Sequence, residues 1–452
     1  MMEVVKTLNH YLWNYILIFL LCGTGIYFSF RLRFVQLRKF NEAFKKTFGG
    51  LSFGKKAGNE GMSSFQALAT AISAQVGTGN LAGAATAIAS GGPGAIFWMW
   101  LSAFFGMSTI FAEATLAQVY KTEKDGQVTG GPAYYISKGL KSNFLAGFFA
   151  VSIIIALGFI GNMVQANSIG AAFKNAFNIN PYIVGAVLAI LTCAIVLGGM
   201  SRIASFAEMV VPVMALFYIL GSLFIIVKNY DNILPAFQMI FVGAFNPQAV
   251  LGGGIGITVK QAVRYGVSRG LFSNEAGMGS TPHAHAVAKV KYPCDQGLVA
   301  IVGVFVDTFV ILTLTALVIL TTNSIGEGVT GIELTQKAFN VGMGSFGEIF
   351  IAISLFFFAF STIIGWYFFG EANIRYLFGK KGLPIYRILV MAFVFLGCGM
   401  KVDLVWELAD FFNGIMVIPN LIAVIGLSSI VTIKLREYEE VNVKKSRVHE
   451  RK

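Results

Sequence analysis

Two stretches of the chain decide its fold: Ser73-Ala-Gln-Val-Gly77-Thr78-Gly79-Asn80-Leu-Ala-Gly83 and Ser273-Asn274-Glu275-Ala276-Gly277-Met278-Gly279-Ser280-Thr281-Pro282. Each lies in the middle of a long apolar run. Glycines separated by one residue weaken a helix, and Asn and Ser side chains offer the backbone competing hydrogen bonds. The sequence therefore predicts that both runs are helices interrupted near their middle.

The regions around these stretches are built for a lipid environment. The chain has 452 residues, of which 56% are hydrophobic and 12% are charged, whereas soluble domains carry roughly a quarter charged residues. Apolar runs of about 20 residues, the length that crosses a ~30 Å hydrocarbon core, recur from one end to the other. These features exclude a soluble globular protein and predict an all-α integral membrane protein.

We predict about eleven membrane-spanning helices. Arg31 and Arg33 follow the first apolar run where a signal peptide would have small residues at its cleavage site, so we expect this run to be retained as a helix. The predicted spans are residues 11–30, 64–90, 94–120, 145–173, 182–199, 205–227, 256–290, 297–322, 345–374, 384–400 and 404–433.

The distribution of basic residues predicts the orientation of these spans. The net charge is +12, which in a soluble chain would raise the question of a nucleic-acid partner. In a membrane protein, Lys and Arg instead concentrate in cytoplasmic loops. An external N-terminus places 26 of the 34 basic residues on the cytoplasmic side. We therefore expect a cytoplasmic C-terminus and no nucleic-acid partner.

The two interrupted helices occupy equivalent places in two halves of the chain. Each opens a group of five spans, and because five is odd, the second group is inverted in the membrane relative to the first. The predicted organisation is an extra N-terminal helix with a basic linker (1–62), a first repeat (63–228), a second, inverted repeat (229–433) and a charged tail (434–452). We expect the linker to form an interfacial amphipathic segment and the tail to be solvated or disordered.

Paired interruptions in two halves are typical of the substrate site of a secondary transporter. A broken helix presents carbonyls at one end and N–H groups at the other, so it can bind a cation and a carboxylate, the two requirements of an amino-acid zwitterion. The alternative is that the glycines only allow close helix packing. Glu113 and Glu275 lie at membrane depth, and we expect them to brace the broken backbone, with a proton relay as the alternative.

A third motif makes a family resemblance visible. The segment Gly91-Gly-Pro-Gly-Ala-Ile-Phe-Trp98-Met-Trp100-Leu-Ser-Ala-Phe-Phe-Gly106 resembles the signature of the alanine or glycine:cation symporter family, and Phe272-Ser-Asn-Glu-Ala-Gly-Met-Gly-Ser280 resembles the same family. The likeness covers most of the chain. It implies the LeuT-like architecture, with ten core helices in a five-plus-five inverted repeat.

The resemblance also implies a set of binding residues. The sodium ligands it implies are the hydroxyls of Ser361 and Thr362 and the carbonyls of Ser73, Val76 and Phe358. The substrate residues it implies are Thr78, Gly79, Asn80, Ser273, Asn274, Gly277 and Met278, with Gln165 and Trp366 as walls. The likeness does not extend to a second sodium site near Asn80, where Gln75 replaces a small residue.

The function expected from the pattern and the resemblance is sodium-coupled symport of alanine or glycine across the plasma membrane by alternating access. A proton-coupled carrier, with Glu275 or Glu113 titrating, is the nearer alternative, and a channel is a more distant one. An intramembrane enzyme is not expected, because no nucleophile–base set or metal motif is visible. His283 and His285 are expected at the membrane interface. The expected partners are the lipid bilayer and the transported amino acid, and no obligate protein partner is evident.

Overall fold

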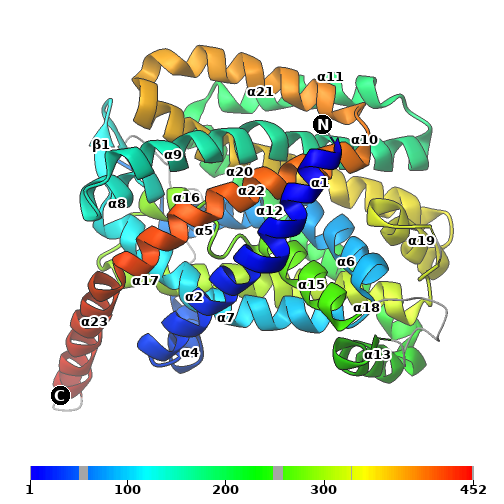
Figure 1. The fold of residues 1–452 in the computed structure, drawn as a ribbon, viewed down its shortest axis with the longest axis horizontal. Helices are drawn as coiled ribbons and strands as arrows, with labels where there is room; N and C mark the ends of the chain where they lie inside the picture. Colours follow the sequence, from blue (N-terminus) through cyan, green and yellow to red (C-terminus); the bar gives the residue numbers. More distant parts are fainter. Residues whose placement is uncertain (1, 50–59, 248–257, 327, 450–452) are drawn as a thin grey trace.

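The computed structural model describes residues 2–49, 60–247, 258–326 and 328–449, which form a bundle of helices with one short hairpin (Figure 1). Residues 50–59 of the predicted linker, residues 256 and 257 of the predicted seventh span and residues 450–452 of the predicted tail lie outside this part of the chain. The interrupted helices occupy the middle of the bundle, and α11 and α21 lie along its upper edge in Figure 1. The fold is therefore built around the two glycine-containing stretches, residues 73–83 and 273–282.

The N-terminal half contains a continuous helical rod, the first interrupted helix and four further helical spans. The elements are α1 (Met2–Tyr11), η1 (Leu12–Leu17), α2 (Ile18–Arg31), α3 (Val35–Arg38), α4 (Phe40–Phe48), α5 (Ser64–Gln75), η2 (Gly79–Gly83), α6 (Ala84–Gly91), α7 (Ala95–Val119), β1 (Thr122–Lys124), β2 (Gln127–Thr129), α8 (Pro132–Gly139), α9 (Asn143–Ile153), η3 (Ile154–Gly161), α10 (Asn162–Phe177), α11 (Pro181–Val196) and α12 (Gly199–Lys228).

The C-terminal half contains the second interrupted helix and the remaining helical elements. Its elements are η4 (Tyr230–Asn232), α13 (Ile233–Phe245), α15 (Val259–Asn274), α16 (Pro282–Ala286), α17 (Pro293–Val304), η5 (Phe305–Leu312), α18 (Thr313–Thr321), α19 (Gly331–Met343), α20 (Phe346–Phe378), η6 (Gly379–Gly382), α21 (Leu383–Cys398), α22 (Val402–Gly426) and α23 (Ser428–His449). The sequence did not predict α13 or α19, which lie between spans, or the antiparallel hairpin of β1 and β2.

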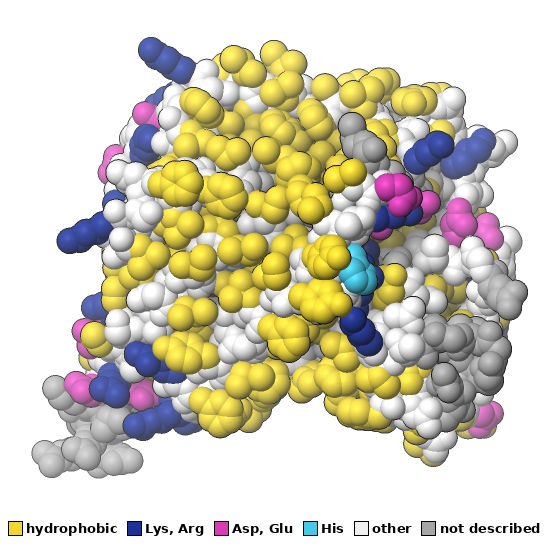
Figure 2. Space-filling model, viewed as in Figure 1, with side chains coloured by type: hydrophobic (Ala, Val, Ile, Leu, Met, Phe, Trp, Pro, Cys, Tyr) yellow, Lys and Arg dark blue, Asp and Glu magenta, His cyan; other side chains and the backbone are white. Residues whose placement is uncertain are grey.

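The outer surface of the bundle suits a bilayer. Seven helices are long and apolar enough to cross a membrane among the described residues. The two interrupted helices are not among them, because each half is short, so the count of eleven spans stays a prediction. Figure 2 shows a broad hydrophobic face, with charged side chains gathered toward its left and right margins. This distribution matches a lipid-facing belt between two aqueous surfaces.

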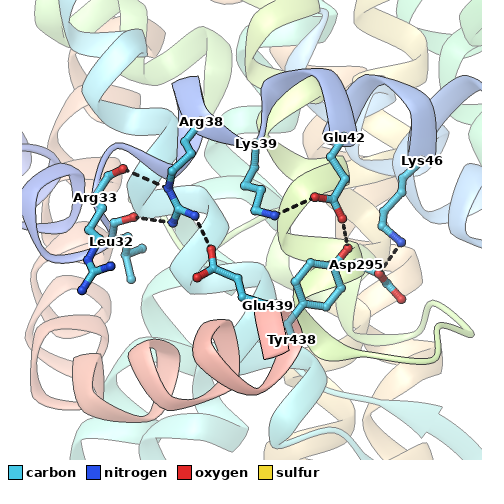
Figure 3. Close-up of polar contacts among 9 residues, drawn as sticks. All are labelled: Leu32, Arg33, Arg38, Lys39, Glu42, Lys46, Asp295, Tyr438 and Glu439. Atoms are coloured by element: carbon cyan, nitrogen blue, oxygen red, sulfur yellow. Dashed lines mark hydrogen bonds and ion pairs between the residues drawn. The ribbon is translucent and has the colours of Figure 1, made fainter. Parts of the chain in front are cut away.

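The C-terminal helix α23 corrects the expectation of a solvated or disordered tail. It is helical to His449, and polar contacts from the middle of the helix join it to α3 and α4, while α4 is joined in turn to the start of α17 (Figure 3). Arg38 pairs with Glu439, and the Tyr438 hydroxyl donates to the Glu42 carboxylate. Lys46 Nζ lies 2.7 Å from Asp295 Oδ1. The linker, the loop before α17 and the tail therefore meet at one end of the bundle.

The ionisation of Glu42 reflects this packing. Burial alone would raise the pKa of the Glu42 carboxyl, but hydrogen bonds from Tyr438 and Lys39 and the nearby lysine charges lower it below its ordinary value. The carboxylate consequently stays charged where α4 meets α23.

The two histidines after the second interruption have their side chains inside the bundle. His283 and His285 are each 1% exposed. The His283 ring stacks between Phe149 and Phe369, with centroid distances of 6.3 and 5.7 Å. His285 Nδ1 lies 2.8 Å from the side-chain nitrogen of Gln296. Both imidazoles therefore have a packing role inside the bundle.

Candidate functional site

The first break, residues 76–78, separates α5 from η2. The Ser63 side chain accepts a hydrogen bond from the Gln66 N–H group, and the Gln66 side chain accepts one from the Ser63 N–H group. This capping box fixes the start of α5. The helix ends at Gln75, where Val76 turns to an extended conformation (φ −81°, ψ 90°). Helical structure resumes at Gly79. The interruption therefore falls where the glycine spacing predicted it.

The second break, residues 275–281, separates α15 from α16. Glu275, Gly277 and Gly279 all have positive φ angles, of 58°, 95° and 78°. Glycine adopts this region at little cost, whereas a residue with a side chain is disfavoured there. A second helical segment, α16, begins at Pro282, where proline fits because its missing N–H would have no helical partner. The local sequence thus dictates the second interruption as well.

The two interrupted helices touch at their breaks. A Cβ atom at Gly79 would lie 2.8 Å from Ser273 Cα, so only glycine allows this close approach. The Gln75 side-chain nitrogen donates to the Asn274 carbonyl over 2.6 Å. Gln75 is the last residue of α5 and Asn274 is the last residue of α15. The interrupted ends of the two helices therefore meet inside the bundle.

Five oxygen atoms predicted to bind sodium converge beside the first break. Thr362 Oγ1 lies 2.9 Å from the Ser73 carbonyl, 3.4 Å from the Val76 carbonyl and 3.0 Å from the Phe358 carbonyl. Ser361 Oγ lies 3.3 Å from the same Ser73 carbonyl. Hydroxyl and carbonyl oxygens are the donors that hard cations prefer, so the donor set fits a sodium ion.

The predicted substrate residues of the first break form a second polar group. The Thr78 N–H donates to the Gln165 side-chain oxygen over 3.1 Å, which brings α10 to the break. The Gly77 N–H donates to Asn80 Oδ1 over 3.0 Å. Both side chains are almost fully buried. Gln165, which the resemblance implied as a wall of the substrate site, therefore contacts the first break directly in this structure.

On the other side, the backbone of the second break is held by a carboxylate from α7. The N–H groups of Gly277 and Gly279 donate to the two oxygens of Glu113, each over 3.0 Å. The Asn420 amide, from α22, donates to Glu113 and to the Gly277 carbonyl. These contacts agree with the bracing role expected for Glu113.

Gly277 and Met278 do not contact the first break in the described hydrogen bonds. A Cβ atom at Gly277 would point toward Leu21 and Leu421, at 3.1 and 3.3 Å. Met278 is fully buried, and its N–H donates to the Glu275 carbonyl. In this conformation, Ser273 and Asn274 are the predicted residues of the second break that lie closest to the first.

Trp366, on α20, packs against η3, α15 and the second break. Its indole N–H donates to the Glu275 carboxylate, and its ring meets that of Phe272 at 5.7 Å between centroids. A Cβ atom at Gly161 would lie 2.5 Å from the same indole. The tryptophan is therefore fixed from three sides, as a steric wall requires.

A cavity of about 490 Å³ leads toward this region from the end of the bundle that carries Lys6, Glu333 and Asp403. Arg269 and Asp410 line it and form a bidentate ion pair, with distances of 2.7 and 2.8 Å.

A row of aromatic contacts continues from that ion pair to Trp366. The Arg269 guanidinium lies 4.7 Å from the Trp406 ring centroid, and Trp406 contacts Phe272. Phe272 in turn meets Trp366. The ion pair and the three aromatic rings therefore link the cavity lining to the second break through side-chain contacts.

Sequence reasoning missed several residues of this centre, among them Asp307, Asn420, Arg269 and Asp410. Asp307 is fully buried and contacts Asn80 and Ser273. An acidic residue within the apolar run 297–322 was the signal that could have identified it, because a carboxylate at membrane depth is usually functional. The contacts of Asn420 and of the Arg269–Asp410 pair depend on the fold and carry no comparable local signal.

Comparisons with known proteins find relatives that match almost the whole chain. A sodium/alanine symporter of Methanococcus maripaludis is 43% identical over 448 residues, covering 97% of this chain and 97% of the relative. A protein named as a putative sodium/proton-dependent alanine carrier of Bacillus subtilis is 43% identical over 457 residues, covering 97% of this chain and 93% of the relative.

The fold is shared with a more distant solved structure. The crystal structure of MhsT in complex with L-phenylalanine aligns with a TM-score of 0.60 at 14% identity, covering 82% of this chain and 89% of that one. This likeness shows the LeuT-type fold. The family model described as the sodium:alanine symporter family matches residues 1–452. The chain therefore belongs to the sodium:alanine symporter family.

Proposed function

We propose that this protein couples the entry of sodium to the uptake of alanine, and of glycine, by alternating access, and that it is a carrier and not an enzyme. The observation that carries the proposal is the meeting of two interrupted helices beside five converging oxygen atoms. Family membership and the names of the relatives support sodium and alanine. Glycine should also be transported, because it is smaller than alanine and has the same two charged groups.

The zwitterion would lie between the two breaks. Its carboxylate is suited to the N-terminal end of η2, because the direction of the N–H groups and the helix dipole favour an anion there. Thr78, Gly79 and Asn80 supply that end, with Gln165 beside it. Ser273 and Asn274 face it from α15. Gly277 and Met278 would approach the substrate only in a different conformation of the second break.

The energy available from one sodium ion is sufficient for useful uptake. One charge that crosses a potential of 100 mV contributes ~2.3 kcal/mol. A tenfold sodium gradient adds ~1.4 kcal/mol. Together these values support an accumulation of several hundredfold per coupled ion. The sodium would bind at Ser361, Thr362 and the carbonyls of Ser73, Val76 and Phe358.

We infer an external N-terminus and a cytoplasmic C-terminus in the plasma membrane. The contacts of Arg38 and Lys46 with α23 and α17 support this orientation, because the linker, the loop and the tail were all assigned to the cytoplasmic side by their basic residues. Lys6 lies at the opposite end of the same helical rod as Arg31. The cavity beside Lys6 would therefore open to the outside, and the Arg269–Asp410 pair would be its inner barrier.

Uptake into proteoliposomes tests the proposed function. Purified protein should accumulate labelled alanine when an inward sodium gradient is imposed, and unlabelled glycine should compete. Replacing sodium with potassium on both sides should abolish accumulation. Accumulation driven equally well by a proton gradient without sodium would favour the proton-coupled alternative, and alanine flux that does not saturate would favour a channel.

Trp366→Ala is expected to broaden the substrate range. Removal of the indole leaves space between Gly161 and Phe272, so larger neutral amino acids should enter. Selectivity for small side chains needs such a steric wall, because attraction alone distinguishes substrates that differ by one methylene by only ~1–3 kcal/mol. The preference for alanine over leucine should fall by about tenfold or more in competition assays. Trp366→Phe should retain most of the preference. Trp98→Ala, which removes an indole bonded to the Ala244 carbonyl, should retain all of it, and an unchanged profile for Trp366→Ala would remove that residue from the wall.

A further inference from the structure

One arginine-containing turn lies far from the helix breaks and has no part in the proposed transport steps. It begins at Arg31, the last residue of α2, and leads through residues 32–34 to α3. Arg33 and Phe34 have positive φ angles of 53° and 51°, a conformation that is costly for residues with a side chain. The Phe34 N–H group donates to the Ser29 carbonyl over 2.6 Å and helps to hold this conformation. The fold therefore fixes the direction of both side chains.

An apolar stripe of α2 leads to this turn. Phe19, Ile26 and Phe30 are exposed, and their spacing of seven and four residues places them on one face of the helix. The Phe30 ring meets the Phe34 ring at 5.1 Å between centroids, so the stripe continues into the turn. Leu37, in α3, is exposed as well. In a membrane, acyl chains cover such a stripe, and the two arginines stand at its end.

The Arg31 guanidinium is held in place and still has unused donors. Its central carbon lies 5.6 Å from the Tyr27 ring centroid, and its Nε donates to Thr432 Oγ1 over 3.3 Å. The Tyr27 hydroxyl lies 2.9 Å from Ser428 Oγ, so α23 fixes both side chains. Neither terminal nitrogen of Arg31 has a hydrogen-bond partner among the described residues. A guanidinium fixed in this way is prepared to donate two parallel hydrogen bonds to a phosphate.

Arg33 supplies a second cation to the same turn. It is exposed, and its guanidinium takes part in none of the ion pairs of the described residues. In Figure 3 its side chain points away from the row of ion pairs. Arg38, Lys39 and Lys46, in that row, each have a carboxylate partner. The positive charges of Arg31 and Arg33, in contrast, are balanced by no carboxylate in the described part of the chain.

We propose that Arg31 and Arg33 bind the phosphate of an acidic phospholipid whose acyl chains lie along Phe19, Ile26 and Phe30. Charge complementarity selects the acidic lipid, because a zwitterionic headgroup brings its own cation to two arginines that already lack a counter-charge. The apolar stripe selects a lipid over a soluble phosphate. The assignment to the cytoplasmic leaflet rests on the proposed orientation of the chain, whereas the site itself does not depend on the transported substrate.

The helix that carries this site packs directly on α7. A Cβ atom at Gly25 would lie 2.8 Å from Phe105 Cβ, which shows how closely the two helices approach. Ser29 Oγ lies 3.0 Å from Ser108 Oγ. Glu113, which holds the second break, follows further along α7. A lipid that fixes the end of α2 against α23 should therefore stabilise the packing behind the second break and speed transport.

Thermal unfolding of the full chain in detergent, titrated with lipid, tests the site. Phosphatidylglycerol should raise the unfolding midpoint with a severalfold higher apparent affinity than phosphatidylcholine, and added salt should reduce the difference. Arg33→Gln should weaken the apparent affinity for phosphatidylglycerol about fivefold, the effect expected of one basic residue at an anionic lipid surface. Lys141→Gln is the matched control and should keep the wild-type affinity, because Lys141 is also exposed, has a φ angle of 56° and is in none of the ion pairs of the described residues.

Equal losses of affinity in Arg33→Gln and Lys141→Gln would reduce the effect to general attraction between basic residues and acidic lipid, and would overturn the proposal. Equal stabilisation by glycerol phosphate, which has the charge but no acyl chains, would overturn it too. Arg33→Lys keeps the charge and should keep most of the affinity, and a loss as large as that of Arg33→Gln would assign the effect to the turn and not to the charge.

Uptake into proteoliposomes links the lipid to transport. Sodium-driven uptake of alanine by the wild type should be severalfold faster in vesicles that contain phosphatidylglycerol than in phosphatidylcholine alone, and Arg33→Gln should lose most of this gain. A rate that does not depend on phosphatidylglycerol would contradict the effect on the second break. A protein that binds phosphatidylglycerol as expected but accumulates no alanine in either vesicle would contradict the proposed function and support the lipid site.

Discussion

Replacement of Thr362 with valine is expected to raise the sodium concentration for half-maximal alanine uptake by about 10- to 100-fold. Valine has the same shape but lacks the hydroxyl that lies within 3.4 Å of three carbonyls of the proposed site. A hydrogen-bonding group that serves a charged partner contributes about 1.5–3 kcal/mol, and each ~1.4 kcal/mol corresponds to a factor of ten. The measurement is the initial rate of uptake against external sodium concentration.

Two variants control for nonspecific effects of this change. Thr362→Ser keeps the oxygen atom and should stay within a few-fold of the wild type. Thr321→Val removes another fully buried hydroxyl, which bonds only to carbonyls of its own helix in the described contacts, and it should leave the sodium curve unchanged. A sodium curve for Thr362→Val that superimposes on the wild-type curve would exclude this hydroxyl from the ion site.

The interruptions of the two helices were predictable because their causes are local. Alternating glycines at Gly77 and Gly79, and again at Gly277 and Gly279, weaken a helix wherever the chain places them, and both helices stop there. Most of the long apolar runs were predictable for the same reason. The sodium ligands required the family resemblance, because an adjacent Ser361 and Thr362 would usually bond back to their own helix.

The remaining features depend on contacts between distant parts of the chain. Glu113 reaches Gly279 across 166 positions, and Arg269 reaches Asp410 across 141. Asp307 was visible in the sequence as an acidic residue in an apolar run, but its partners Asn80 and Ser273 come from distant segments and could not be predicted. The tail was expected to be solvated because of its charge. Leu435 and Tyr438 of α23 are buried nevertheless, because that helix packs against other parts of the chain. The sequence pattern of the tail could not predict this packing.

Glu113→Gln is expected to impair the protein much more than Glu275→Gln, although both changes replace a buried carboxylate with an amide. The Glu113 oxygens each accept a fixed backbone N–H group. An amide can accept only one of these and turns its own N–H₂ toward the other, which leaves a buried donor unsatisfied at a cost of about 1–3 kcal/mol. The partners of Glu275 include the Ser280 hydroxyl, which can rotate and accept from the new amide.

The contrast between the two variants separates bracing from proton transfer. Glu113→Gln should lower the thermal unfolding midpoint in detergent by several degrees more than Glu275→Gln does, and it should reduce alanine uptake equally at every pH. A Glu113→Gln protein that is as stable as the wild type and has lost only the pH dependence of uptake would instead identify Glu113 as a proton relay. The expected outcome follows from the direction of two peptide N–H groups, which cannot rotate away from an amide while the second break keeps its positive φ angles.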